Sequence, residues 1–391
     1  MKFDFDKVVD RHGTKCLKYD FAKERGRSDD MLPLWVADMD FQTAPGIQKS
    51  LSDAVAHGIY GYSEGKDDYF QAAAGWYEKH FGWKVEKEWL IKTPGVVFAL
   101  AMAVKAYTKE GDAVLLQQPV YYPFSEVITD NHRRLINSPL QQLDGHYEIN
   151  FEEFEQKIVE ENVKLFLMCS PHNPVGRVWK EWELRKIGDI CLKHNVLVVS
   201  DEIHSDFTYG ENIHHVFASL DEKYAAITTT CTAPSKTFNI AGLQISNIWI
   251  SNPELRARFR AEVTAAGYSQ VNLMGLVACQ AAYETGEEWL KELKTYLEGN
   301  LDYVRTFLKE NLPEIKLTEP EGTYLLWLDF KSLGMKEEQL KDLVENKAKL
   351  WLDSGAMFGP DGEGFERINI ACPREILKQA LTQLAESVHD R

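Results

Sequence analysis

Long apolar runs are missing from this 391-residue sequence, and no stretch approaches the roughly 18 to 20 residues that cross a bilayer. Cysteine is scarce as well: the 6 cysteines stand far apart, with no C-x-x-C pair and no histidine at zinc-ligand spacing. Positive charge is in deficit, since 44 lysines and arginines face 60 acidic residues. We therefore predict no metal site, reduced and mostly buried cysteines, and neither nucleic acid nor a membrane as partner.

Residues 1–6 carry alternating charges, a pattern that excludes the apolar core of a signal peptide. Together with the lack of a membrane-spanning run, this predicts a cytoplasmic protein. The composition, 44% hydrophobic and 27% charged, is typical of globular proteins, and the length suggests two or three structural units.

Short β-branched and apolar runs alternate with segments of helical period, which indicates an α/β protein built around a mostly parallel sheet. The predicted strands are 113–116, 164–168, 196–199 and 225–230, and an almost wholly apolar helix is predicted over 99–107. From about residue 284 the pattern changes to long charged helices, 287–310 and 336–350, with a strand at 324–328. We therefore expect a large domain at 46–283, a small α+β domain at 284–391, and an N-terminal arm at 1–45 that contributes to the small domain.

Three of the predicted strands are followed by unusual polar groups: Asn173, Asp201 and Lys236. Because ligands bind beyond the carboxyl ends of parallel strands, we expect these side chains to meet in one crevice. They match the needs of pyridoxal 5'-phosphate (PLP), which takes a lysine for a Schiff base, an acid beside the pyridine nitrogen and a donor to the 3'-oxygen. His204, three residues after Asp201, is a second candidate for the 3'-oxygen.

A phosphate site is predicted at Gly95, Val96 and Val97, where small residues open a helix and present free amide groups.

Each candidate residue of the predicted cofactor site also has an ordinary structural explanation when it is taken singly. Lys236 can be a solvated lysine, Asp201 can cap the following helix, and the segment 173–176 can be a simple turn.

Seven motifs carry a family resemblance along nearly the whole chain. They are 34–41 (LWVADMDF), 60–63 (YGYS), 119–124 (PVYYPF), 173–176 (NPVG), 201–204 (DEIH), 235–243 (SKTFNIAGL) and 367–373 (RINIACP). With these seven motifs in this order, the sequence resembles a fold-type-I PLP enzyme of the class I/II aminotransferase superfamily. It is most similar to the branch of cystathionine β-lyases and cysteine C–S lyases.

The resemblance implies a three-layer fold around a mostly parallel seven-stranded sheet, with a smaller α+β domain. It also implies a homodimer in which Tyr62 reaches the cofactor phosphate of the neighbouring subunit. The other implied roles are ring stacking by Tyr121, protonation of the leaving group by Tyr122, phosphate binding by Ser235, binding of the substrate carboxylate by Arg367, and lining of the substrate recess by Trp35 and Ala37.

The activity implied is β-elimination from cystathionine or a related S-substituted L-cysteine, giving a thiol, pyruvate and ammonia. One departure bears on this expectation: many aminotransferases of the superfamily have an arginine eight residues after the Schiff-base lysine, and Gln244 stands there. The lyase branch resembles this sequence in lacking that arginine. An aminotransferase acting on an L-amino acid and a 2-oxo acid remains an alternative, as does a PLP-binding protein without turnover.

Overall fold

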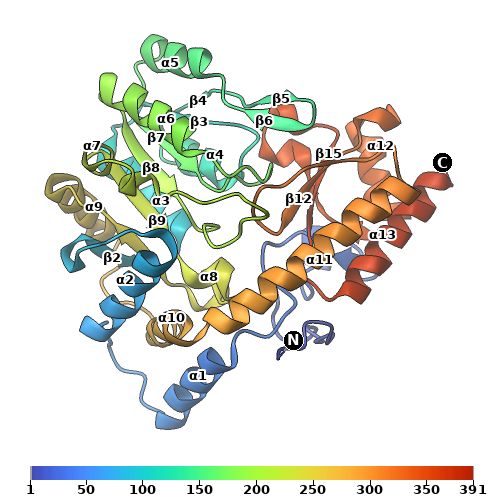
Figure 1. Ribbon diagram of the computed structural model, residues 1–391, viewed down its shortest axis with the longest axis horizontal. Helices are drawn as coiled ribbons and strands as arrows, with labels where there is room; N and C mark the ends of the chain where they lie inside the picture. Colours follow the sequence, from blue (N-terminus) through green and yellow to red (C-terminus); the bar gives the residue numbers. More distant parts are fainter. Residues whose placement is uncertain (1, 391) are drawn as a thin grey trace.

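A seven-stranded sheet forms the centre of the computed structural model, which describes residues 2–390 (Figure 1). Its strands, in spatial order, are β2 (Leu90–Thr93), β10 (Ser246–Trp249), β9 (Thr228–Thr232), β8 (Leu197–Asp201), β7 (Leu165–Cys169), β3 (Ala113–Leu116) and β4 (Arg134–Asn137). Strand β10 runs antiparallel to both of its neighbours, and the remaining pairs are parallel. The prediction of a mostly parallel seven-stranded sheet is confirmed.

Helices cover both faces of this sheet because its strands are apolar on both sides. In β3, Val114 and Leu116 pack into one core with α3, α4 and α9, whereas Ala113 and Leu115 pack into the other with α5 and α6. The helices are α3 (Val96–Tyr107), α4 (Pro123–Thr129), α9 (Pro253–Ala265), α5 (Phe151–Glu160), α6 (Glu181–Lys193) and α7 (Glu222–Ala225). The three-layer arrangement is thus also confirmed.

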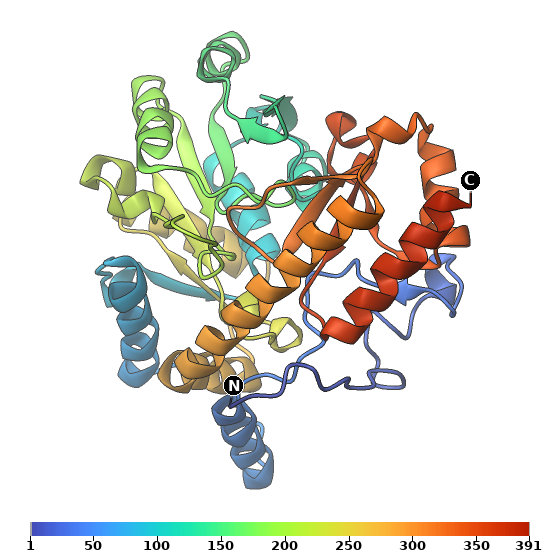
Figure 2. The ribbon, with the colours of Figure 1, turned by 45° about the vertical axis from the view of Figure 1, so that its right-hand side comes forward.

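Three further helices pack together near the β2 edge: α1 (Pro45–His57), α2 (Asp67–Phe81) and α10 (Leu273–Thr285). Figure 2 shows α1 projecting from the lower end of the molecule. A hairpin of β5 (Gln141–Leu143) and β6 (His146–Glu148) lies outside the central sheet.

A second sheet, antiparallel throughout, is formed by β11 (Lys316–Thr318), β12 (Leu325–Asp329), β15 (Phe365–Asn369) and β14 (Asp353–Ser354). The long helix α11 (Glu287–Asn311) runs from α10 towards this sheet and packs beside α13 (Arg374–His389) (Figure 1). The N-terminal segment joins this part of the chain, because β1 (Leu32–Pro33) pairs with β13 (Leu350–Trp351).

Two predicted elements differ from the observed ones. The strand expected at 225–230 begins only at Thr228, because Asp221 caps the short helix α7 by accepting a hydrogen bond from the backbone N–H of Lys223. The helix expected at 336–350 is interrupted: α12 (Glu337–Lys341) gives way to a π-helical segment, and Leu350 is drawn into the strand that pairs with β1. The strand expected at 324–328 lies at 325–329, and the helix at 287–310 is α11.

All 6 cysteines are free, and each of them except Cys16 is buried. No helix within residues 2–390 combines the length and apolarity needed to cross a membrane.

Candidate active site

A cavity of about 180 Å³ lies beyond the carboxyl ends of β7, β8 and β9. Most of the residues singled out in the sequence line it: Ala37, Gly95, Val96, Val97, Tyr121, Asn173, Asp201, His204, Ser235 and Lys236. Arg367 and Trp35 adjoin this set through hydrogen bonds. Tyr122 does not line the cavity, but its ring lies next to that of Tyr121. Tyr62 lies apart from them, with its side chain 94% exposed.

Lys236 lies on the four-residue helix α8 (Pro234–Thr237), directly after β9. Its Nζ donates a 2.7 Å hydrogen bond to the backbone carbonyl of Ala37. Burial lowers the pKa of Lys236 from 10.5 to about 8, and the charge of Arg367 acts in the same direction against the carboxylates of Asp38 and Asp201. Near pH 7.5 a substantial fraction of the Lys236 amine is therefore neutral, and the neutral form is the one that acts as a nucleophile or a general base.

Asp201 ends strand β8, and its Oδ1 accepts a hydrogen bond of 3.1 Å from the backbone N–H of Ile203. Burial raises the pKa of Asp201 to about 7, and no cationic side chain within residues 2–390 forms an ion pair with it. A buried carboxylate in this position favours a positively charged partner.

His204 lies close to Lys236, whose charge adds to the effect of burial in lowering the pKa of His204 to about 3. The imidazole is therefore neutral at physiological pH. Its Nδ1 is buried and has no hydrogen-bond partner among the described residues. A buried polar atom of this kind is suited to a polar ligand group.

The phosphate-binding segment predicted at 95–97 forms the N-terminus of α3, with Gly95 at the N-cap. No side chain caps this helix, so its first backbone N–H groups have no intrahelical or side-chain acceptor. Val96 and Val97 line the cavity together with Ser235. Helix N-termini of this kind bind anions. Gln244 is exposed and does not line the cavity.

Arg367 lies on β15 and is 2% exposed. Its Nη1 donates to Asn173 Oδ1 at 3.0 Å, and its Nη2 donates to the Trp35 carbonyl at 2.8 Å. The same Nη2 forms an ion pair with Asp353. Trp35 contributes this carbonyl while its indole ring stacks on Trp351, with ring centroids 4.5 Å apart.

Tyr121 and Tyr122 precede helix α4, and their ring centroids are 5.0 Å apart. The backbone N–H of Tyr121 donates to the carbonyl of Asn173 at 3.0 Å, which fixes Tyr121 at the cavity. Burial raises the pKa of Tyr122, so its hydroxyl stays protonated at neutral pH and can donate a proton or a hydrogen bond.

The segment 36–41 connects the part of the site that carries Lys236 with the part that carries Arg367. Asn239, which follows the helix that carries Lys236, donates to the carbonyls of Met39 and Phe41 at 2.9 and 2.8 Å. Asn369, on the same strand as Arg367, donates to the carbonyls of Val36 and Asp38 at 2.6 Å each. Both asparagines lie within the sequence motifs, but nothing in their local pattern indicated this bridging contact.

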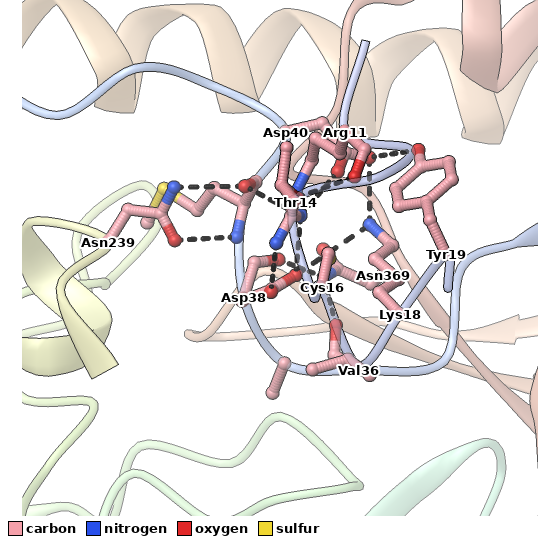
Figure 3. A network of polar contacts seen from close by, with 12 residues as sticks. Arg11, Thr14, Cys16, Lys18, Tyr19, Val36, Asp38, Asp40, Asn239 and Asn369 are labelled. Atoms are coloured by element: carbon pink, nitrogen blue, oxygen red, sulfur yellow. Dashed lines mark hydrogen bonds and ion pairs between the residues drawn. The ribbon is translucent and has the colours of Figure 1, made fainter. Parts of the chain in front are cut away.

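Ion pairs with the first residues of the chain also fix the segment 36–41, as Figure 3 shows. Arg11 pairs with Asp38 at 2.6 Å and with Asp40 at 2.7 Å, and the buried Lys18 pairs with Asp40 at 2.7 Å. Asp38 also raises the pKa of Lys236, against the larger effect of burial. Asp38 therefore contributes to the electrostatics of the site, and Arg11 holds its carboxylate by an ion pair. Sequence reasoning missed this pair because the charges of residues 1–20 have no distinctive spacing.

The side chains at this cavity fit PLP. The buried carboxylate of Asp201 suits a protonated ring nitrogen, the unpartnered Nδ1 of His204 suits a ring substituent, and the uncapped N-terminus of α3 suits a phosphate. A lysine whose pKa is about 8 suits an aldehyde.

Solved structures with the same fold carry this cofactor. The chain is similar to PLP-containing cystalysin from Treponema denticola, with 39% identity, full coverage of both chains and a TM-score of 0.96. It is also similar to the PLP-bound C–S lyase from Staphylococcus hominis, with 34% identity over 99% of this chain and 98% of the other and a TM-score of 0.93. Fold and site together define a PLP-dependent enzyme of fold type I.

The chain belongs to the aminotransferase class I and II family, whose model matches residues 30–384. Among curated relatives it is 43% identical to the cystathionine β-lyase PatB of Bacillus subtilis, over 97% of this chain and 98% of the relative. It is 33% identical to the protein MalY of Escherichia coli, over 99% of both. An aspartate aminotransferase of Pyrococcus abyssi is 25% identical over 93% of this chain and 92% of the relative.

Proposed function

We propose that this protein is a PLP-dependent C–S β-lyase that cleaves cystathionine or a related S-substituted L-cysteine to a thiol, pyruvate and ammonia. The observation that carries the proposal is the similarity to cystathionine β-lyase PatB over essentially the whole chain, which is higher than the similarity to the aminotransferase relative. The position of Lys236 beside Asp201 and Arg367 in one site is consistent with it.

We propose Lys236 as the base that removes the proton from the Cα atom of the substrate. When bound, PLP supplies an aldehyde that condenses with amines and a ring that accepts the electron pair left on a deprotonated carbon. Lys236, with a pKa of about 8, takes the proton from the Cα atom of the substrate near neutral pH. Asp201 would hold the ring nitrogen, and its buried carboxylate would favour the protonated form of that nitrogen.

Arg367 binds the α-carboxylate of the substrate through its guanidinium N–H groups, and Asn173 orients it by accepting one of these hydrogens. Ala37 and Trp35 belong to the segment that borders this position. We propose Tyr122 as the acid for the leaving sulfur, because its raised pKa keeps the hydroxyl protonated. Tyr121, which lines the cavity, would stack on the cofactor ring.

We propose that the enzyme works as a homodimer. Tyr62 is 94% exposed and lies in a segment in which Ile59 and Tyr60 are also largely exposed, an apolar cluster suited to a protein interface. In a dimer this tyrosine would bind the phosphate of the neighbouring subunit's cofactor, beside Ser235 and the N-terminus of α3.

The structural units proposed are the arm at 1–45, the large PLP-binding domain at 46–283 and the small domain at 284–391. We also propose a cytoplasmic location, because 6 free cysteines are typical of a reducing compartment.

The test is product analysis of the purified holoenzyme. With cystathionine alone, we expect pyruvate, ammonia and homocysteine in equal amounts. Turnover that appears only after 2-oxoglutarate is added would contradict the lyase proposal and favour the aminotransferase. The Lys236→Ala variant is the matched control and should form no pyruvate.

A further inference from the structure

Asp353 lies directly opposite Arg367 in the antiparallel ladder between β14 and β15. Side chains of such a pair point to the same face of the sheet and come into contact. Both residues are almost fully buried, at 3% and 2% exposure, and their side chains form an ion pair. The sheet register therefore fixes a carboxylate against the arginine that we propose for substrate binding.

A guanidinium group has five N–H donors, and a carboxylate that accepts two parallel bonds uses either the Nε/Nη2 edge or the Nη1/Nη2 edge. Both edges include Nη2. In Arg367, Nη2 already donates to the Trp35 carbonyl and to Asp353, and Nη1 donates to Asn173. Cζ of Arg367 also lies over the ring of Phe358, 4.9 Å from the ring centroid.

Nε is buried and has no partner among the described residues. A substrate carboxylate that accepts two parallel bonds must nevertheless displace one of the two acceptors at Nη2, because both edges include that atom. The Trp35 carbonyl belongs to the backbone, and the chain is fixed on both sides of it: the pairing of β1 holds the residues before it, and Asn369 binds the Val36 carbonyl after it. The Asp353 carboxylate is on a side chain that can rotate. Asp353 is thus the acceptor that yields.

We propose that Asp353 is a specificity-determining residue that competes with the substrate carboxylate for Arg367 and thereby sets the Michaelis constant. The inference rests on the proposed role of Arg367. Because the charge of Arg367 is already balanced, an α-carboxylate binds more weakly than it would to an unpaired arginine, and a neutral residue at position 353 strengthens that binding.

The experiment compares the wild-type holoenzyme with Asp353→Asn and, as a second substitution, Asp353→Ser. The control is Glu366→Gln, which removes a neighbouring buried acid paired in register with Ser354 rather than with Arg367. Two substrates are used: an S-substituted L-cysteine and its α-carboxamide. Thermal unfolding and the absorbance of the bound cofactor establish that each variant is folded and loaded.

For Asp353→Asn we expect KM for the carboxylate substrate to fall about tenfold, the difference that one hydrogen bond to a charged group makes, with kcat changed less than about twofold. KM for the carboxamide should not change, and Glu366→Gln should resemble the wild type. An unchanged or raised KM in both Asp353 variants would overturn the inference, since a residue that only supports Arg367 would raise KM when removed.

A calorimetric titration with acetate tests the competition between Asp353 and a carboxylate ligand without any turnover. Acetate should bind Asp353→Asn more tightly than the wild type, and equal or weaker binding counts against the inference. If the wild type cleaves no S-substituted cysteine, the proposed function fails, yet the acetate comparison still decides the role of Asp353. If Arg367→Gln leaves KM and acetate binding unchanged, the role of Arg367 fails and the inference about Asp353 fails with it.

Discussion

Replacing Lys236 by methionine should stabilise the cofactor-free protein at neutral pH. Burial lowers the pKa of this amine from 10.5 to about 8, because the folded site disfavours its charged form. Below pH 8 the amine is protonated in both the folded and the unfolded state, and the folded state then bears a free-energy penalty of about 3 kcal/mol. Above pH 10.5 the amine is neutral in both states and the penalty vanishes.

The penalty should fall by about 2 kcal/mol between pH 7 and pH 9.5, as the two pKa values require. A methionine side chain cannot donate the hydrogen bond to the Ala37 carbonyl, and this loss reduces the gain in stability by about 1 kcal/mol at every pH. Lys236→Met should accordingly be more stable than the wild type by roughly 2 kcal/mol at pH 7 and about equal to it at pH 9.5.

The assay is urea unfolding of both proteins after removal of PLP, followed by fluorescence at the two pH values. Lys316→Met, at an exposed position on β11, is the control and should show no comparable change with pH. If the stability difference between Lys236→Met and the wild type is the same at pH 7 and pH 9.5, the reasoning about the buried amine is refuted.

Four further experiments test the proposed site. Asp201→Asn should lower kcat about 100-fold, through the loss of a charge-assisted hydrogen bond, and a loss smaller than threefold in steady-state kinetics would contradict the role of Asp201. Arg367→Gln should raise KM for S-substituted cysteines about 100-fold, and an unchanged KM would remove it from carboxylate binding. Tyr122→Phe should lower turnover of cystathionine, whereas turnover equal to the wild type would exclude it as the acid. Mixed dimers of Tyr62→Ala and Lys236→Ala subunits should regain activity that neither parent has, because one site then holds both side chains; no regain on mixing would place Tyr62 outside the partner's site.

Much of the fold could be predicted from local pattern. The alternation of apolar strands with helical segments indicated the parallel sheet, and the long periodic helix at 287–310 was placed almost to the residue. The errors at 225–230 and 336–350 arose where a side-chain cap or pairing with a distant strand decided the local conformation. Such partners do not appear in a local window of sequence.

Local sequence pattern is enough to bring Asn173, Asp201 and Lys236 to one site, because polar residues that follow parallel strands come to the same edge of the sheet whatever the details of packing. The surroundings of these residues depend on contacts between distant parts of the chain. The Ala37 carbonyl meets Lys236 across 199 positions of sequence, and Asp353 meets Arg367 through the register of two antiparallel strands. Contacts of this kind depend on how separate elements pack and align, and that arrangement is a property of the whole folded chain rather than of any one segment.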